Sequence, residues 1–440
     1  MQSLSSFTLW RLVFQSGPNI QVLLGTGVFA VWVVLVMTAA WNAPGDDLSP
    51  IYLSGRLMTM GESHRIYNRN SKDFSEARDP VWLKTARQCE IQNFPHPYVQ
   101  IPIWAKVISP LAGSVSFPVF MRWAIFGSLC CMGGMILLTQ KLWRLQPANV
   151  AVFGIAVLAL SLSEPFKYSI GLVQTHPLFL FSMLLATYCS HRDRPWLAGF
   201  ILACATIVKI TPLALGVYWL CTGRWREAIG FAASLVGLAA LSVGWLGGEL
   251  HLEYLDVLRR ASGESIVAFN NQCVRVWLMD MISPPNYYFD WTLVETPKWI
   301  GPVNLLLAGI CFSAILAVRW KTQRTPREYD RWGVPAIILM SILFAPIAWS
   351  HYYVFIVTPV LLFIDAAYQR RQYAWAGLAV LIIALNIYPI AVGPLANTDA
   401  NKILWMTIVR SHLLSGVLSI VGLLALAWSE RKPTPPKKLD

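Results

Sequence analysis

Charged side chains are scarce in this sequence of 440 residues. Asp, Glu, Lys and Arg together make up 13% of it, whereas soluble domains carry about 25%. Apolar residues make up 56%, and the mean hydropathy is +0.51. This composition excludes an ordinary soluble enzyme. It predicts an all-α polytopic membrane protein, because crossing a bilayer takes about 20 mostly apolar residues.

Signatures of cofactor and metal sites are also missing. The sequence has no Gly-rich phosphate loop, no CxxC pair and no Cys/His spacing typical of zinc. We therefore expect no cofactor, no metal and no soluble nucleotide-sugar site. Of the eight cysteines, only Cys89 and Cys273 fall in long polar stretches. A disulfide between these two is left open, for the case that both loops face an oxidising compartment.

Acidic residues are fewer than basic ones, 23 against 35, which gives a net charge of +12. Nucleic acid would be one partner for such a charge. However, the cations sit in short loops between apolar runs, and basic loops that face the cytoplasm explain them more simply. We expect no nucleic-acid partner.

Apolar runs divide the chain into predicted spans. Twelve runs contain no Lys, Arg, Asp or Glu, and they cover 21–41, 123–140, 145–163, 168–190, 195–208, 210–223, 228–248, 299–318, 332–350, 352–364, 372–398 and 411–429. Basic residues follow every second run, which predicts cytoplasmic termini in a bacterial plasma membrane. The first run is span-length, so we interpret it as a signal anchor rather than a cleavable signal.

The long polar stretches fall on the predicted outer face. They cover about 42–116 and 249–298, and a basic tail, 430–440, closes what we interpret as one membrane domain, 1–440. The stretch 98–113 is too interrupted for a span, so an interfacial or re-entrant helix is expected there. Two short runs meet at "VKITP" (208–212), where Pro212 prevents one continuous helix and leaves Lys209 near the outer headgroups.

Ionisable residues inside membrane segments are costly and are functional candidates by default. Seven residues in or beside the predicted spans map to the outer face, which predicts a single polar site there: Asp46, Asp47, Arg122, His176, Lys209, His351 and Arg410. Structural alternatives stay open. The aspartates could form a solvated turn or cap a helix, the arginines could be snorkelling anchors, and the histidines could be satisfied core residues.

These residue types suit one kind of chemistry. A carboxylate can act as general base on a hydroxyl, and cations or helix N-termini can hold a phosphate. Together they indicate sugar transfer from a lipid-linked phosphosugar. A phosphate leaves as an anion without a proton donor, so one carboxylate suffices, whereas hydrolysis of an ordinary glycoside usually needs two.

Four stretches carry a resemblance to a known family: "DLSPIYLSGRLMTMGESHRIY" (47–67), "ATIVKITPLALGVYWLCTGRWR" (205–226), "FNNQCVRVW" (269–277) and "LFAPIAWSHYYVFIVTPVLL" (343–362). Through them the chain resembles the GT-C superfamily of polytopic glycosyltransferases, and within it glycosyltransferase family 87. That family includes polyprenyl-phosphate-mannose-dependent mannosyltransferases of mycobacterial lipid assembly. The resemblance runs from about residue 21 to 370.

The resemblance implies roles for individual residues. The presumed catalytic base maps to Asp47, with Asp46 as second choice or as an orienting partner. Candidates for binding the donor phosphate are Lys209, Arg122, Arg410 and His351. Candidates for binding sugar hydroxyls or the acceptor are Gln174, His176, Asn271, Gln272 and Trp349.

The chain departs from the family pattern at three places. "VQTH" (173–176) keeps Gln174 but has His176 where the family tends to have Asn. Tyr352 takes the place of the usual second aromatic residue or His after His351. The stretch "FPHPYVQIP" (94–102) only loosely follows the family's Tyr-Pro-Pro pattern. The predicted fold is unaffected by these departures.

The resemblance implies an inverting enzyme that moves a sugar, with mannose favoured, from polyprenyl phosphate to a glycolipid or glycan on the outer face. Membrane lipids surround it. Arabinofuranosyl or other pentosyl transfer is the alternative within the same fold. A secondary transporter is the rival from another class, because broken helices and intramembrane charges are shared features. A non-catalytic lipid-binding subunit is the third hypothesis.

Overall fold

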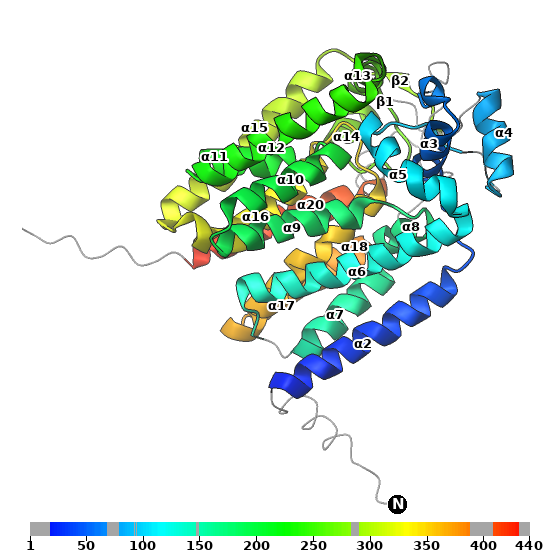
Figure 1. Ribbon diagram of the computed structural model, residues 1–440. Coiled ribbons are helices and arrows are strands. Elements are labelled where there is room, and N and C mark those ends of the chain that lie inside the picture. Colours follow the sequence, from blue (N-terminus) through cyan, green and yellow to red (C-terminus); the bar gives the residue numbers. More distant parts are fainter. Residues whose placement is uncertain are drawn as a thin grey trace, which may run out of the picture.

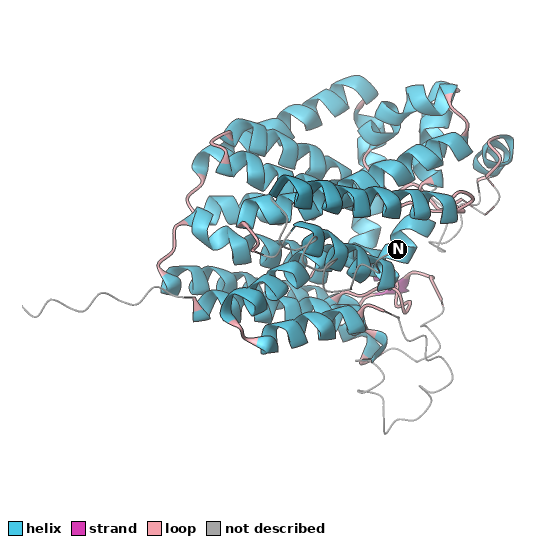
Figure 2. Cartoon of the chain, turned by 90° about the horizontal axis from the view of Figure 1, so that it is seen from below, coloured by secondary structure: helices cyan, strands magenta, loops and turns pink. Residues whose placement is uncertain are grey.

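The computed structural model describes residues 18–67, 79–91, 93, 95–146, 149–282, 290–387 and 408–430. This part of the chain is almost wholly helical (Figure 2). Its α-helices are α2 (Pro18–Ala39), α3 (Ser49–Thr59), α4 (Pro80–Gln88), α5 (Pro102–Ser114), α6 (Phe117–Trp143), α7 (Asn149–Leu162), α8 (Glu164–Gly171), α9 (His176–His191), α10 (Pro195–Val208), α11 (Leu213–Cys221), α12 (Trp225–Leu246), α13 (Gly248–Gly263), α14 (Val274–Asp280), α15 (Ile300–Thr322), α16 (Pro326–Leu343), α17 (Val357–Arg370), α18 (Tyr373–Leu385) and α20 (Ser411–Ser429).

Short 3₁₀-helices and a pair of short strands accompany these α-helices. Among the described residues, two segments are 3₁₀-helical, η1 (Ser63–Arg65) and η3 (Ser350–Ile356). The strands β1 (Glu264–Ser265) and β2 (Val294–Glu295) pair antiparallel, with Glu264 opposite Glu295. The longer helices run side by side, while α3, α4, α5, α13 and the strand pair gather at one end (Figure 1). We call this the loop end. The first turn of α2 and the last turn of α20 lie at the opposite end (Figure 1).

Exposed apolar surface identifies the environment of the bundle. In the described part of the chain, 6 helices are long and apolar enough to cross a membrane, or 7 if α7 and α8, bent by 74°, form one span. Only 11% of the apolar window of α2 is buried, and 17% of those of α12 and α15. Their side chains form an apolar surface that suits lipid rather than water. The protein is therefore an all-α polytopic membrane protein, as predicted.

Each of the twelve predicted runs contains described helix, although several boundaries were predicted wrongly. The run 168–190 is divided between α8 and α9, because the chain breaks at 172–175 with Val173 in the left-handed region (φ 55°). Within 372–398, α18 ends at Leu385, and 388–407 lies outside the described residues. Hydropathy does not detect a break that contains no charged residue.

Helix α16 also differs from its predicted run, 332–350. It begins at Pro326, because Thr325 and Glu328 form a capping box that brings a charged first turn into the helix. It ends at Leu343, before the residues that lead into η3. Charge alone was therefore a poor marker of the helix start.

The predicted break at 208–212 is confirmed. Helix α10 ends at Val208 and α11 begins at Leu213, so Lys209 lies between two short helices. A helix is also present where the interfacial one was predicted: α5 has 13 residues and packs against α3. The contact is close, since a Cβ placed on Gly55 would lie 3.1 Å from the Cβ of Ala112.

No disulfide joins Cys89 to Cys273, so the pairing left open by the sequence is wrong in this structure. All eight cysteines are free. Cys273 is fully buried, with its Sγ 3.8 Å from the carbonyl oxygen of Pro346. Burial raises the pKa of the Cys89 thiol, which keeps this side chain neutral at neutral pH.

Candidate active site

Asp46 and Asp47 lie in the turn between α2 and α3, at the loop end. Gly45 takes a positive φ of 65° there and donates its N–H to the carbonyl of Gly171 at 3.3 Å. The N–H of Asp47 donates to the carbonyl of Leu172 at 3.2 Å. The main chain of the turn is thereby fixed to the break between α8 and α9.

Neither aspartate caps α3 through its side chain. The N-cap position is Leu48, and no side-chain capping bond is present there. The sequence-based alternative of a capping role is therefore wrong. Both carboxylates instead face the segment between α4 and α5: Nδ1 of His96 lies 2.6 Å from Oδ1 of Asp47, and Nδ2 of Asn93 donates to Oδ1 of Asp46 at 2.8 Å. The Asp47 side chain is 24% exposed, so a substrate can reach it.

Lys209 is held by two neighbours in the break between α10 and α11. Its Nζ donates to the hydroxyl of Tyr352 and, at 3.1 Å, to Nε2 of His176. Since an ammonium group only donates, Nε2 of His176 must accept and its Nδ1 must carry the proton. That Nδ1 lies 3.1 Å from Oε1 of Gln174, which accepts from it. Gln174 and His176 therefore orient the lysine.

The ammonium group of Lys209 keeps capacity for a ligand. Two of its three N–H bonds are used by His176 and Tyr352, and no carboxylate of the described residues forms an ion pair with it. The main chain of Asp47 is bonded to Leu172, at the start of the break that ends before His176, the residue that binds Lys209. The site thus combines an accessible carboxylate with a cation that can still bind an anion.

His351 is buried beside this lysine. It is 2% exposed, and its ring centroid lies 4.8 Å from that of His176 and 5.1 Å from that of Tyr352. Its Nε2 has no hydrogen-bond partner in the described part of the chain. Buried polar atoms without partners are rare in native structures and require an explanation. A polar ligand at this site would provide the partner.

Arg122 lies on α6, half-buried. Its guanidinium carbon is 3.9 Å from the ring centroid of Trp41, just beyond the end of α2. Its Nε is buried without a hydrogen-bond partner among the described residues. The cation–π contact fits an anchor, and the unpaired N–H leaves phosphate binding open as well.

Arg410 has a structural role, which corrects its prediction as a donor-phosphate ligand. Its Nε and Nη2 donate to the two carboxylate oxygens of Asp280, both at 2.8 Å. Nη1 and Nη2 donate further to four carbonyl oxygens, those of Val267, Ala268, Phe269 and Asn271. An arginine has five N–H bonds, so none remains for a phosphate. The side chain is also only 1% exposed.

Asn271 and Gln272 are likewise committed to the protein. Asn271 donates to the carbonyl of Ile266 at 2.8 Å and accepts from the N–H of Ala348 at 3.0 Å. The amide of Gln272 donates to two carbonyl oxygens, and both residues are 0% exposed. Asn271 also forms a β-bridge with the half-buried Trp349. These residues fix the second loop against the chain that leads into His351, so direct sugar contacts by either amide are not supported.

Sequence reasoning missed His96, Glu164, Ser350 and His412. His96 contacts the proposed base, although a histidine in a polar loop gave no signal. Glu164 accepts a hydrogen bond from Ser350 at 2.8 Å, and its Oε2 lies 2.9 Å from Nε2 of His412. Glu164, Ser350 and His412 are all buried. Glu164 lies between the apolar runs 145–163 and 168–190, and a charged residue at that position was the sequence feature that could have identified it. Its hydrogen bond holds Ser350, the residue before His351.

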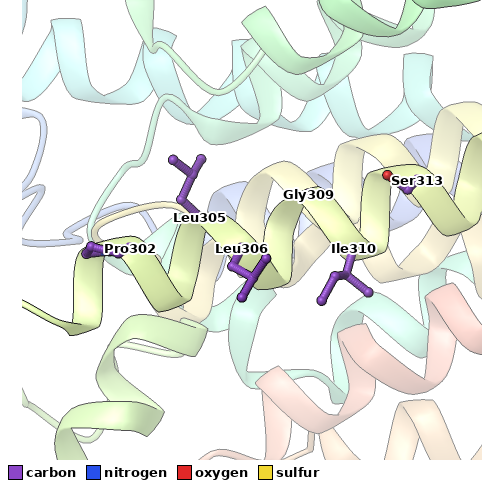
Figure 3. A pocket seen from close by; sticks show the side chains of 6 residues that line it. All are labelled: Pro302, Leu305, Leu306, Gly309, Ile310 and Ser313. Atoms are coloured by element: carbon purple, nitrogen blue, oxygen red, sulfur yellow. The ribbon is translucent and has the colours of Figure 1, made fainter.

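Two surface hollows lie away from this cluster. One, of about 670 Å³, follows one face of α15 (Figure 3) and is lined by Pro302, Leu305, Leu306, Gly309, Ile310 and Ser313. It is apolar and lies on a helix that exposes most of its surface, as expected of a lipid-facing side. The other, of about 230 Å³, is bordered by Tyr52 and Arg56 of α3. Burial raises the pKa of that tyrosine to about 12.

Among the described residues, no group of three or more His, Cys, Asp or Glu is arranged to hold a metal ion. Within the described part of the chain, neither Lys209, which contacts His176, nor Arg122, which contacts Trp41, forms an ion pair.

The fold defines an integral-membrane protein, and the comparison with known families gives its class. The sequence model of glycosyltransferase family 87 matches residues 101–346, which is more than half of the chain. The protein belongs to this family and is a membrane glycosyltransferase.

Curated relatives agree with this family. A Mycolicibacterium smegmatis polyprenol-phosphate-mannose-dependent alpha-(1-2)-phosphatidylinositol pentamannoside mannosyltransferase is 25% identical over 355 residues, 76% of this chain and 77% of the relative. A Mycobacterium tuberculosis protein of the same description is 25% identical over 303 residues, 67% and 65% of the two chains. A second M. smegmatis protein, described as a phosphatidylinositol mannoside mannosyltransferase, is 23% identical over 279 residues, 62% and 60%. No solved structure matches the chain.

Proposed function

We propose that the protein transfers a sugar, preferentially mannose, from a polyprenyl-phosphate-linked donor to a glycolipid or glycan acceptor, with inversion. The observation that carries the proposal is that Asp47, a reachable carboxylate, is bonded through its main chain to the break before His176. That histidine binds Lys209 and packs against His351, two groups with remaining hydrogen-bonding capacity. The relatives support the donor, since each is described as polyprenol-phosphate-mannose-dependent. Their acceptors, phosphatidylinositol mannosides, indicate a glycolipid.

The reaction uses a single base. Oδ2 of Asp47 takes the proton of the acceptor hydroxyl while that oxygen forms a bond to the anomeric carbon. The bond from the anomeric carbon to the phosphate oxygen breaks, and its electron pair leaves with the lipid phosphate. Lys209 and the Nε2 of His351 bind that phosphate as its charge grows. Because the hydroxyl and the phosphate occupy opposite faces of the sugar, the anomeric configuration inverts.

The proposed topology has twelve spans in a bacterial plasma membrane, with both termini cytoplasmic and the site facing outward. Its support is the arrangement of the bundle. The helices of the loops 42–116 and 249–298 gather at the loop end, and the first turn of α2 and the last turn of α20 lie at the opposite end (Figure 1). We treat residues 1–440 as one domain. Most of the tail 430–440 lies outside the described residues.

A transfer assay tests the proposal directly. Purified protein in proteoliposomes should move radiolabelled mannose from polyprenyl-phosphate-mannose to a mannosylated phosphatidylinositol acceptor, with the anomeric configuration of the product opposite to that of the donor. Transfer only from a polyprenyl-phosphate pentose would replace mannose by arabinofuranose or a related sugar. Substrate flux across the membrane without any transfer would establish a transporter instead.

Replacing Lys209 by Met should raise the KM for the donor lipid by about 10- to 100-fold, because a hydrogen bond to a charged group contributes about 1.5–3 kcal/mol. The acceptor KM should change little. Lys106 provides a matched control: it lies on α5 with its ammonium group 5.5 Å from the ring centroid of Trp245. Lys106→Met should leave both constants near the wild-type values. An unchanged donor KM in Lys209→Met would remove the lysine from the phosphate site.

A further inference from the structure

We propose that His96 is a positioning residue for the catalytic base, an inference that rests on the proposed function. His96 belongs to the segment between α4 and α5, and its Nδ1 lies 2.6 Å from Oδ1 of Asp47. The two residues are 49 positions apart in sequence. The histidine lies just before the residues matched by the family model, 101–346.

The main chain around His96 is held in place. Pro95 and Pro97 flank it, which fixes φ at both prolines and restricts His96 itself to extended conformations. Pro95 is buried. The next residue, Tyr98, is 1% exposed, donates its hydroxyl to the carbonyl of Ile101 at 2.8 Å and accepts from the N–H of Ala105 at 3.1 Å. A half-exposed imidazole is thus carried on a main chain with little conformational freedom.

The chemistry of the contact fits positioning rather than proton storage. An ionised carboxylate only accepts hydrogen bonds, so Nδ1 of His96 carries the proton and donates it to Oδ1. This leaves Oδ2 of Asp47 for the acceptor hydroxyl. After Oδ2 has taken the substrate proton, Oδ1 is a carbonyl oxygen and still accepts from the same N–H. The bond to His96 can therefore persist through the reaction while the carboxylate stays aligned.

The same segment also distinguishes the two aspartates. Asn93, which is exposed, holds Asp46 by a neutral amide at 2.8 Å. The imidazole of His96 is 30% exposed and the carboxylate of Asp47 24% exposed. The shorter and less exposed bond belongs to Asp47, which is the geometry expected of a carboxylate that must keep one orientation.

Three substitutions separate positioning from other roles. The amide nitrogen of Asn reaches about the place of Nδ1, whereas that of Gln reaches toward Nε2. His96→Ala and His96→Gln should lower kcat by about 10- to 100-fold, because small misplacements of a reacting group cost up to about 100-fold. The donor KM should stay unchanged. His96→Asn should restore most of kcat. His64→Ala is the matched control, since His64 pairs with Glu62 at 3.5 Å in the same loop and is 67% exposed.

The outcomes are distinct. Wild-type kcat in His96→Ala would overturn the inference, as would equal losses in the Asn and Ala variants. Melting curves of each variant in detergent show whether a loss reflects unfolding, and the Asn variant keeps the test decisive if Ala unfolds the loop. Failure of the proposed function would look different, because the wild type itself would then transfer no sugar. An active wild type, an inactive Asp47→Asn and a fully active His96→Ala would reject only the role of His96.

Discussion

Asp47→Asn should lower the rate of sugar transfer by about 10²- to 10⁴-fold, the range that general-base catalysis contributes. The amide has nearly the shape of the carboxylate and can still accept from Nδ1 of His96, but it cannot take a proton from the acceptor hydroxyl. Folding and donor binding should therefore persist. The measurement is single-turnover transfer of mannose in membranes, together with the melting temperature and the affinity for donor lipid.

Asp46→Asn is the matched control for this prediction, because it makes the same change one residue away. Its carboxylate accepts from Asn93, and we expect a much smaller loss. A larger loss in Asp46→Asn than in Asp47→Asn would exchange their roles. Normal transfer by both variants would exclude either carboxylate as the base. Harmless removal of both, in a protein without detectable transfer, would favour a non-catalytic lipid-binding subunit.

Arg410→Met should destabilise the protein by about 3–5 kcal/mol, the cost of removing one partner from a buried ion pair. The carboxylate of Asp280 is 0% exposed and would lose both of its bonds to the guanidinium. Four carbonyl oxygens of the second loop would lose donors as well. Unfolding in detergent, followed through tryptophan fluorescence, measures the change in the free energy of unfolding.

Two further variants assign this loss to structure rather than to donor binding. Arg259→Met removes an ion pair with Asp256 whose side chains are 80% and 65% exposed, and it should change stability little. Arg410→Met/Asp280→Leu also removes the carboxylate that has lost its arginine, so part of the stability should return. The donor KM of this double variant should remain near the wild-type value. A strongly raised donor KM in a stable double variant would restore Arg410 to the phosphate site.

The sequence predicted the membrane class, the approximate positions of the helices and the break at Lys209, because each depends on local composition. It did not predict the break before His176 or the charged start of α16. Main-chain hydrogen bonds produce the first, and the capping box of Thr325 and Glu328 produces the second. Neither the break nor the helix start can be recognised in a hydropathy profile.

The candidate site was predicted only in part, because some of its contacts join residues far apart in the sequence. Lys209 and Arg410 look alike in sequence, since each is a cation at the outer end of an apolar run. Only the position of Asp280, 130 residues from Arg410, separates a paired arginine from an available lysine. His96 was missed because a histidine in a polar loop has no distinguishing pattern until the fold brings it to Asp47.

Main-chain hydrogen bonds fix the separation of Asp47 from Lys209. The N–H of Asp47 is bonded to Leu172, which begins the break that ends at His176, and His176 orients the lysine. Substitutions in the loops 42–116 and 249–298 that leave Asp47 and these bonds intact can therefore change which acceptor hydroxyl reaches the proposed base without changing the path along which the sugar moves. Acceptor preference and reaction geometry can then diverge independently during evolution, so relatives with different glycolipid products need not differ in their transfer chemistry.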